Sequence, residues 1–266
     1  MKNNCKMEKK PFKSSTNIIL LSAGSGSRMG SMTADIPKSL LPMGEKTVLD
    51  WTLDAITKKT DGEIVIVTGH QKTAVEKHVT ERYPQRVKFA HNTRYADDVN
   101  ILSLDLGVNA LCMPETGYLI VETDVVLDEY AWDKIFDEIE QNHSFWVCKG
   151  RYHIGLTGGI VHVDENHQVL AVDYQPKYNS YYDGWAKMVG LLYVGPQQVS
   201  NDRLLRADAI AKSIKQYYLM PWHSKIEKLP CRCLDLGDCF AGTFNTETDF
   251  HSVVKEYFTN QSSKSC

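Results

Sequence analysis

The 266-residue sequence predicts an α/β protein built on a doubly wound, mixed but mainly parallel sheet. In the first half, short apolar runs alternate with longer segments of helical periodicity, which is typical of strands buried on both faces of a parallel sheet. In the second half, shorter alternating segments indicate mixed or antiparallel strands. Because no linker rich in Gly, Pro or Ser interrupts the chain, we expect one domain over 17–266 behind a flexible tail at 1–16.

The first half supplies the parallel part of the sheet. Residues 17–23 (NIILLSA) predict its first buried strand. Strands joined through helices in this order form right-handed parallel crossovers, and their repetition gives an open doubly wound sheet. The elements that follow are predicted as helix 47–56, strand 63–68, helix 71–83, strand 87–90, helix 99–111 and strand 118–121.

After residue 132 the spacing of apolar residues shortens and alternates. Such alternation predicts half-buried strands of a mixed or antiparallel region. The predicted strands are 144–149, 159–163, 168–174 and 188–194. Two helical patterns, 197–218 and 246–257, close the chain.

Composition excludes several classes of protein. A formal net charge of −3 argues against a protein that coats nucleic acid, which would present a basic face. The first 16 residues are polar and contain no apolar run, so we expect neither a signal peptide nor a membrane anchor, and a cytoplasmic protein. Seven cysteines in such a chain are expected to be reduced. A zinc site at Cys231, Cys233 and Cys239 with His223 is the alternative to ordinary strand and loop cysteines.

A glycine-rich turn, Gly24-Ser25-Gly26-Ser27, follows the first predicted strand directly. Small residues at such a turn allow backbone N–H groups to approach phosphate oxygens closely. Arg28 adds a delocalised cation that can hold phosphate bidentately. Lys38, placed by the fixed backbone of Pro37, is a second cation. The pattern predicts a site for a phosphorylated ligand.

Two common phosphate-binding motifs do not fit these residues. A Walker loop requires Gly-Lys-Ser/Thr, which the chain lacks. The dinucleotide fingerprint requires its third glycine one residue before Gly30, and Asp50 lies in a helical pattern and not at a strand end. A Rossmann oxidoreductase is therefore disfavoured.

The sequence resembles the nucleotidyltransferases typified by NDP-sugar pyrophosphorylases, whose signature L-x-x-G-x-G-x-R precedes a Pro-Lys pair. Residues 21–28 and 37–38 match both parts in order. The resemblance implies a Rossmann-like nucleotidyltransferase fold, an NTP substrate and release of pyrophosphate. It implies catalytic roles for Arg28 and Lys38 in stabilising the transferred charge. The implied nucleotide-binding residues of the loop are Leu21, Ala23, Gly24, Ser25, Gly26, Ser27, Arg28 and Lys38.

Acidic residues end the strand predicted at 118–121. Ligands of open α/β sheets lie at the carboxyl edge, and a carboxylate there can hold Mg²⁺ against a phosphate. The resemblance assigns Asp124 as the first Mg²⁺ ligand, with Glu122 in a supporting position. It nominates Asn245, near the C-terminus, as the second ligand. The alternative is that Asn245 or Thr246 caps a helix.

Within the family the sequence is most similar to bacterial phosphocholine and phosphonate cytidylyltransferases, over residues 17–135. The similarity lies in 66–70 (IVTGH), 92–95 (NTRY), 100–103 (NILS) and 124–127 (DVVL). It implies CTP as the preferred NTP and makes Asn100 and Ser103 candidate nucleoside contacts. Helix capping is the alternative for both residues.

Residues 174–187 hold five aromatic side chains among carboxylates and amines. Aromatic faces beside an acid suit an ammonium group, by cation–π attraction worth about 0.5–2 kcal/mol per contact. We expect this segment to bind an amine-bearing acceptor, and Lys187 to meet the acceptor's phosphate or phosphonate and act in catalysis. A tyrosine-rich surface loop is the alternative. The candidate acceptor-binding residues are Tyr174, Tyr178, Tyr182, Trp185 and Lys187.

The predicted function is a Mg²⁺-dependent cytidylyltransferase that joins CMP from CTP to a small phosphorylated or phosphonate acceptor, of the phosphocholine or 2-aminoethylphosphonate type. A sugar-1-phosphate nucleotidyltransferase is the first alternative, and a nucleotide-binding regulatory module without turnover is the second. No nucleic-acid or membrane partner is expected. The sequence leaves the oligomeric state open, a homo-oligomer included.

Overall fold

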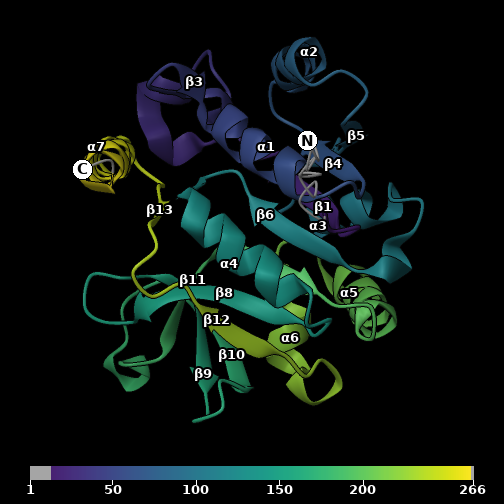
Figure 1. The fold of residues 1–266 in the computed structure, drawn as a ribbon. Helices are drawn as coiled ribbons and strands as arrows, with labels where there is room; N and C mark the ends of the chain where they lie inside the picture. The colour runs from purple at the N-terminus through teal and green to yellow at the C-terminus, as the bar shows by residue number, and fades with distance from the viewer. Residues whose placement is uncertain (1–12, 265–266) are drawn as a thin grey trace, which may run out of the picture.

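A nine-stranded mixed sheet runs through the computed structural model, which describes residues 13–264 (Figure 1). Its parallel part has the order β5-β4-β1-β6, and its register pairs Ile19 of β1 with Val65 and Ile120. All four strands lie where apolar runs predict them. Their bounds are β1 Asn17–Ser22, β4 Ile64–Thr68, β5 Lys88–His91 and β6 Tyr118–Glu122.

The second half extends this sheet with mainly antiparallel strands. The long strand β11 (Ala186–Val194) pairs antiparallel with β6, β8 and β9, so it joins the two halves. The mixed sheet predicted from the sequence is confirmed. The other strands of this half are β8 Phe145–Arg151, β9 Gly158–Val163, β10 Val169–Gln175 and β12 Arg232–Asp235, the last parallel to β8.

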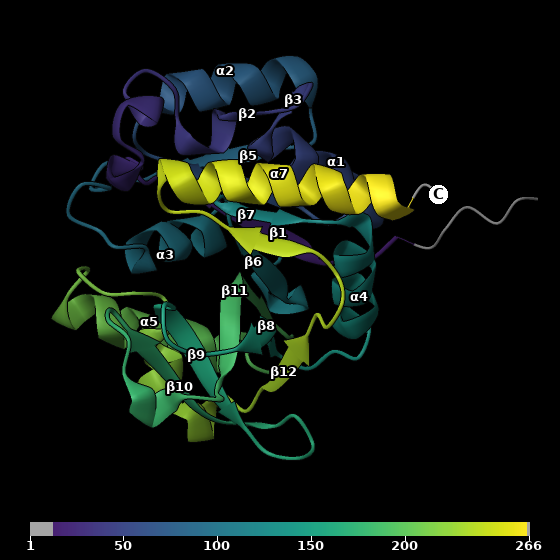
Figure 2. The same cartoon turned by 90° about the vertical axis from the view of Figure 1, so that its left-hand side faces the viewer.

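Helices cover both faces of the sheet, as a doubly wound fold requires (Figures 1 and 2). One face carries α1 (Val48–Lys59), α2 (Lys72–Arg82) and α4 (Glu129–Ile139). The opposite face carries α3 (Ile101–Asn109), α5 (Val199–Lys212) and α6 (Met220–Ser224). None of the described helices is long and apolar enough to cross a membrane.

The C-terminal helix α7 (Glu247–Lys264) packs on two small sheets outside the main one (Figure 2). Its Tyr257 ring contacts Trp51 edge-on, at 5.5 Å between centroids. The strands of the small sheets are β2 Pro42–Met43 with β3 Lys46–Thr47, and β7 Val125–Leu127 with β13 Ala241–Thr243.

The single helix expected over 197–218 is wrong in its second part. α5 ends at Lys212, because Ser213 is extended and its hydroxyl accepts the Lys215 N–H. The Gln216 amide donates to the carbonyl of Ala209 at 2.6 Å. Residues 213–219 therefore form an irregular segment, and it reaches back to the start of α3 through the hydrogen bond from Val99 N–H to the Ile214 carbonyl.

The flexible tail expected at 1–16 falls largely on residues 1–12, outside the described residues. The four described residues of that segment pack against the end of α1. Ser14 forms a bridge with Thr60, and the Thr60 hydroxyl donates to the Thr16 carbonyl at 2.7 Å. The packed chain thus begins before β1.

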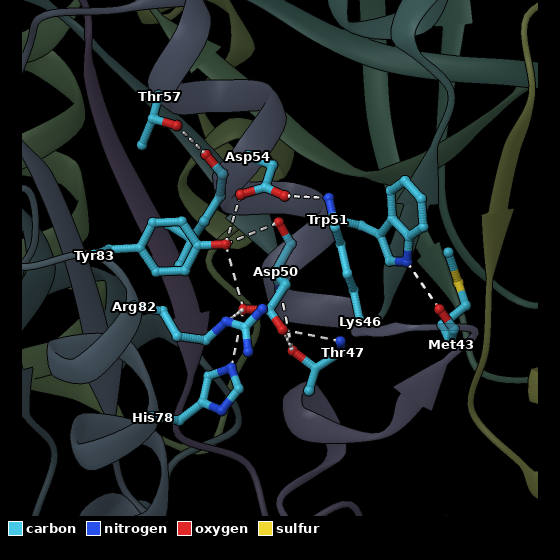
Figure 3. Close-up of polar contacts among 11 residues, drawn as sticks. Met43, Lys46, Thr47, Asp50, Trp51, Asp54, Thr57, His78, Arg82 and Tyr83 are labelled. Atoms are coloured by element: carbon cyan, nitrogen blue, oxygen red, sulfur yellow. Dashed lines mark hydrogen bonds and ion pairs between the residues drawn. The ribbon is translucent and has the colours of Figure 1, made fainter.

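Asp50 is the centre of a polar cluster between α1 and α2 (Figure 3). Its side chain is 1% exposed, with Nε2 of His78 at 2.9 Å and Nε of Arg82 at 3.2 Å. Thr47 completes a capping box with Asp50 at the first turn of α1. Burial by itself raises the pKa of Asp50, but the hydrogen bonds from Thr47 and His78 outweigh it, so that pKa is lowered. Asp50 is therefore a structural link between two helices.

Replacing Asp50 by asparagine should lower the free energy of unfolding by about 2–3 kcal/mol, because a buried charge-assisted network loses its charge. Urea denaturation measures this change. The matched control is Asp133→Asn. Asp133 is an exposed acid of α4 that pairs with Lys59 of α1, and its replacement should lower the free energy of unfolding by less than about 1 kcal/mol. Equal losses in the two variants would contradict the structural role of Asp50.

The contribution of Asp50 to stability should also depend on pH. Because its folded pKa is lowered, the contribution is complete above the unfolded value of about 3.9 and is lost as the pH falls through the folded value. The stability difference between wild type and Asp50→Asn should therefore narrow below about pH 4. A difference that widens on acidification would be inconsistent with this linkage.

Candidate active site

A cleft of about 540 Å³ opens where the carboxyl ends of β1 and β6 meet β11. Residues 21–24 and 122–124 come from the two strand ends, and 187–190 come from β11. This position matches the site that open α/β sheets use for ligands. A second hollow, of about 580 Å³, is lined only by the surface segment 175–180 and lies outside this strand-end arrangement.

The glycine loop forms one wall of the cleft. Gly26 has a φ of 64°, in the left-handed region, and a Cβ there would lie 3.3 Å from the Cβ of Lys38. The loop is held because Gly26 O accepts the Thr33 hydroxyl at 3.0 Å. Ser25 belongs to the loop but does not line the cleft. The predicted nucleotide-binding residues that do line it are Leu21, Ala23, Gly24, Gly26, Ser27, Arg28, Lys38, Asn100 and Ser103.

Lys38 lies inside the cleft, at the first position of the short helix η2 (Lys38–Leu40). A hydrogen bond of 2.9 Å between the buried hydroxyls of Ser22 and Ser39 fixes η2 to the end of β1. The Lys38 ammonium lies 2.7 Å from Oδ2 of Asp124 and 4.9 Å from the centre of the Phe244 ring. Both charged side chains remain partly open, at 14% and 22% exposed. A fixed cation thus lies directly beside the predicted metal ligand.

Strand pairing brings the two predicted metal ligands into one cleft from distant parts of the sequence. β7 pairs antiparallel with β13, and the Phe244 N–H donates to the carbonyl of Asp124 at 3.1 Å. Asn245 follows directly and lines the cleft with Asp249. The hydroxyl of Thr246 accepts the Asp249 N–H, so Thr246 caps α7 and this cap does not use the Asn245 side chain.

The donor set at this point suits Mg²⁺. Asp124 offers a carboxylate and Asn245 an amide oxygen, which are hard donors. Within residues 13–264, no group of three or more His, Cys, Asp or Glu side chains is placed to hold a metal. Mg²⁺ commonly uses one or two protein carboxylates and completes its shell with water and phosphate oxygens. Asp124 and Asn245 fit an ion that is bound largely by a nucleotide.

The far wall of the cleft contains Glu122 and Lys187. Burial raises the pKa of Glu122 to about 8, with a further increase from Asp124 and an opposing effect of Lys38 and Lys187. Burial also lowers the pKa of Lys187, whose ammonium donates to the carbonyls of Gly159 at 3.2 Å and Met188 at 2.8 Å. Two donors of Lys187 are therefore already used, and the third remains for a ligand.

Asn100 and Ser103 line the cleft but already have internal partners. Asp98 caps α3 by accepting the N–H of Leu102 at 3.1 Å and of Ser103 at 2.8 Å. The Ser103 hydroxyl also donates to Asp98, at 2.7 Å. Asn100 accepts the N–H of Tyr218 at 2.8 Å and donates to Glu122 at 3.4 Å. The capping role considered for the two residues therefore belongs to Asp98.

The predicted acceptor-binding residues separate into two groups. Tyr174 and Lys187 line the cleft, whereas Tyr178, Tyr182 and Trp185 do not. The segment folds outward because buried Tyr152 holds it: Tyr152 N–H donates to the Trp185 carbonyl at 2.7 Å, and the two rings of Tyr152 and Tyr178 stack. Trp185 stacks on His162 and contacts Tyr182 edge-on. These three aromatics therefore pack outside the cleft, Tyr178 on Tyr152 and the other two in an outer aromatic cluster with His162.

Sequence reasoning missed Tyr217 and Tyr218, which replace those aromatics in the cleft wall. The Tyr217 ring stacks on Tyr174 at 3.9 Å, and their hydroxyls hydrogen-bond at 2.6 Å. The Tyr218 ring stacks on buried Trp146 at 5.9 Å. Both tyrosines belong to the irregular segment 213–219, which the sequence pattern assigned to a helix. No local sequence signal distinguishes them from helical residues.

The cleft lies at the strand ends where open α/β folds bind ligands, and comparison with known proteins gives the family of this chain. The chain belongs to the MobA-like NTP transferase domain family, whose model matches residues 18–175. The nucleotidyltransferase family resemblance is thus confirmed. The structure superposes on a solved CTP:phosphocholine cytidylyltransferase from Streptococcus pneumoniae with a TM-score of 0.75 and 17% sequence identity. The superposition covers 92% of this chain and 100% of the cytidylyltransferase chain. That match shows the shared fold.

Curated relatives are similar over part of the chain. Choline-phosphate cytidylyltransferase of Streptococcus pneumoniae is 33% identical over 33% of this chain and 37% of its own. 2-Aminoethylphosphonate cytidylyltransferase of Lancefieldella rimae is 27% identical over 59% of this chain and 60% of its own length. UTP–glucose-1-phosphate uridylyltransferase of Salmonella typhimurium is 30% identical over 42% of this chain and 45% of its own length. The chain thus matches less than two thirds of the length of each relative.

Proposed function

We propose that this protein is a cytidylyltransferase, which transfers CMP from CTP to a small acceptor bearing a phosphate or phosphonate and releases pyrophosphate. The observation that carries the proposal is the Lys38–Asp124 pair, which lies beside the glycine loop at the carboxyl ends of β1 and β6. CTP is preferred over other NTPs because two relatives are named as cytidylyltransferases.

In the proposed reaction an ionised oxygen of the acceptor attacks the α-phosphorus of CTP, and the bond to pyrophosphate breaks. The attacking oxygen is already deprotonated near neutral pH, so the reaction needs no general base. The protein's contribution is to align the two substrates and to neutralise negative charge as it moves to the leaving pyrophosphate. Arg28 and Lys38 are placed for this neutralisation on the loop side of the cleft.

Asp124 and Asn245 are the residues that would hold Mg²⁺. When bound, Mg²⁺ would neutralise charge on the nucleotide phosphates. Lys187, on the far wall, has one ammonium donor left and would orient the acceptor's anionic group. The cleft is therefore divided into a loop side for the triphosphate and a β11 side for the acceptor.

An acceptor that also carries an amine fits the β11 side. The stacked rings of Tyr174 and Tyr217, with the Tyr218 ring nearby in the same wall, present aromatic faces beside the carboxyl of Glu122. Such faces attract an ammonium group. This wall supports phosphocholine or 2-aminoethylphosphonate as the acceptor type, and the names of two relatives agree with it.

Pyrophosphate release measured with four NTPs against several acceptors tests the proposal. CTP should be the best nucleotide, and phosphocholine or 2-aminoethylphosphonate should exceed glucose-1-phosphate. UTP with glucose-1-phosphate is the second candidate, because one relative is named as a uridylyltransferase for that sugar phosphate. Tight CTP binding without pyrophosphate release from any pair would instead indicate a regulatory nucleotide-binding module.

Tyr217→Ala should raise the KM for the acceptor about 10-fold and change the KM for CTP little, because a cation–π contact is worth about 0.5–2 kcal/mol. Tyr182→Ala is the matched control, since Tyr182 lies in the sequence-predicted segment but outside the cleft. Steady-state kinetics with each substrate varied in turn measures both values. A larger effect of Tyr182→Ala would return the acceptor site to the outer aromatic cluster.

A further inference from the structure

Glu122 is the meeting point of three chain segments in the far wall of the cleft. It ends β6, and its carboxyl accepts the side-chain amide of Asn100 from the start of α3 at 3.4 Å. The hydroxyl of Tyr218, from segment 213–219, interacts electrostatically with the same carboxyl.

Asn100 closes this arrangement into a ring of contacts. Its amide oxygen accepts the Tyr218 N–H at 2.8 Å while its amide nitrogen donates to Glu122. Asn100 thus links the backbone of Tyr218 to the carboxyl of Glu122. Because segment 213–219 has no helical hydrogen-bond ladder, these side-chain contacts replace it in fixing the backbone.

β11 is shaped to accept this carboxyl. Gly190 has a φ of 82°, at an irregularity in the pairing of β11 with β8. A Cβ at Gly190 would lie 2.9 Å from Oε2 of Glu122 and 3.1 Å from Val125. The irregularity in β11 and the absence of a side chain at Gly190 therefore make room for the Glu122 carboxyl.

We propose that Glu122 is a positioning residue that, through Asn100 and Tyr218, fixes segment 213–219 as the acceptor-side wall of the cleft. The inference deepens the proposed function, on which its kinetic part rests. Tyr217 immediately precedes Tyr218 in the segment, and its ring stacks on Tyr174 within the cleft. Losing the anchor at Tyr218 therefore displaces the aromatic pair and leaves the glycine loop and Lys38 unchanged.

Glu122→Ala and Glu122→Gln separate this role from direct substrate binding. Glutamine keeps the size and an acceptor oxygen for Asn100 but cannot ionise. A positioning role therefore survives the change, whereas a direct contact that requires an ionised carboxylate beside a cationic acceptor does not. Glu122→Ala should raise the KM for phosphocholine or 2-aminoethylphosphonate at least 10-fold, with the KM for CTP within about 3-fold. Glu122→Gln should restore most of the affinity for the acceptor.

Hydrogen exchange on the unliganded protein tests the anchor without any need for turnover. The Tyr218 amide should exchange at least 10-fold faster in Glu122→Ala than in wild type, while glutamine should retain the protection. Amides of β4, remote from the segment, are the internal control. If the wild type shows no turnover, the proposed function fails but the exchange result still decides whether Glu122 fixes the segment.

Two results would overturn the inference. Unchanged exchange at Tyr218 in Glu122→Ala would show that the segment does not depend on this carboxyl. Equal loss of acceptor affinity in the glutamine and alanine variants would show that the charge of Glu122 acts on the substrate directly. A parallel rise in the KM for CTP and for the acceptor would indicate a general structural role and would count against it as well.

Discussion

Replacing Asp124 by alanine is expected to reduce kcat by about 10³-fold or more, because it removes the only carboxylate proposed to bind Mg²⁺ at the transferred phosphate. Asp124 lies in the turn between β6 and β7, 22% exposed, so the loss should not arise from unfolding. Pyrophosphate release at saturating CTP and acceptor measures the change, and circular dichroism measures the fold.

The control for this prediction is Asp137→Asn, which removes an exposed acid of α4 outside the cleft. It should leave kcat within about 2-fold of wild type. Raising the Mg²⁺ concentration should not restore the alanine variant fully, since the neutral Asn245 is then the sole protein ligand. An Asp124→Ala enzyme with near-normal turnover would refute the metal assignment.

Lys38→Met is expected to lower kcat by about 10²–10³-fold, because the ammonium stabilises charge that develops on the leaving pyrophosphate. The chain offers a closely matched control in Lys46→Met. Lys46 lies 2.6 Å from Asp54 and 4.9 Å from the centre of the Trp51 ring, which repeats the pairing of Lys38 with Asp124 and Phe244 outside the cleft.

The comparison between the two lysine variants separates catalysis from loss of an ion pair. Lys46→Met should cost stability of about 1 kcal/mol or less and leave kcat nearly unchanged. Lys38→Met should lose turnover with a similar change in stability. Equal kinetic effects in the two variants would remove Lys38 from the proposed mechanism.

The loop side of the cleft could be predicted from the sequence because its signals are local. The apolar run of β1, the glycines after it and the Pro37-Lys38 pair are contiguous and keep the same geometry wherever a parallel strand enters such a turn. The position of Asp124 could be predicted for the same reason, since it follows a buried strand at the sheet edge.

The acceptor side could not be predicted because its geometry depends on contacts between distant segments. The helical pattern over 197–218 is interrupted at Ser213. In the irregular segment that follows, the Tyr218 N–H donates to Asn100, 118 residues away in the sequence. In the same way the hydrogen bond from the Tyr152 N–H to the Trp185 carbonyl directs Trp185 away from the cleft, although the residues around Trp185 resemble a binding loop. Long-range hydrogen bonds of this kind leave no periodicity to read.

The most direct test of the central claim follows the phosphorus atoms of CTP through the reaction. CTP labelled at the α-phosphorus or at the γ-phosphorus is incubated with the protein, Mg²⁺ and phosphocholine or 2-aminoethylphosphonate, and the products are separated. We expect the α-label to enter the organic product and the γ-label to appear in pyrophosphate. Transfer of γ-label to the acceptor, or its release as orthophosphate, would contradict nucleotidyl transfer in this cleft.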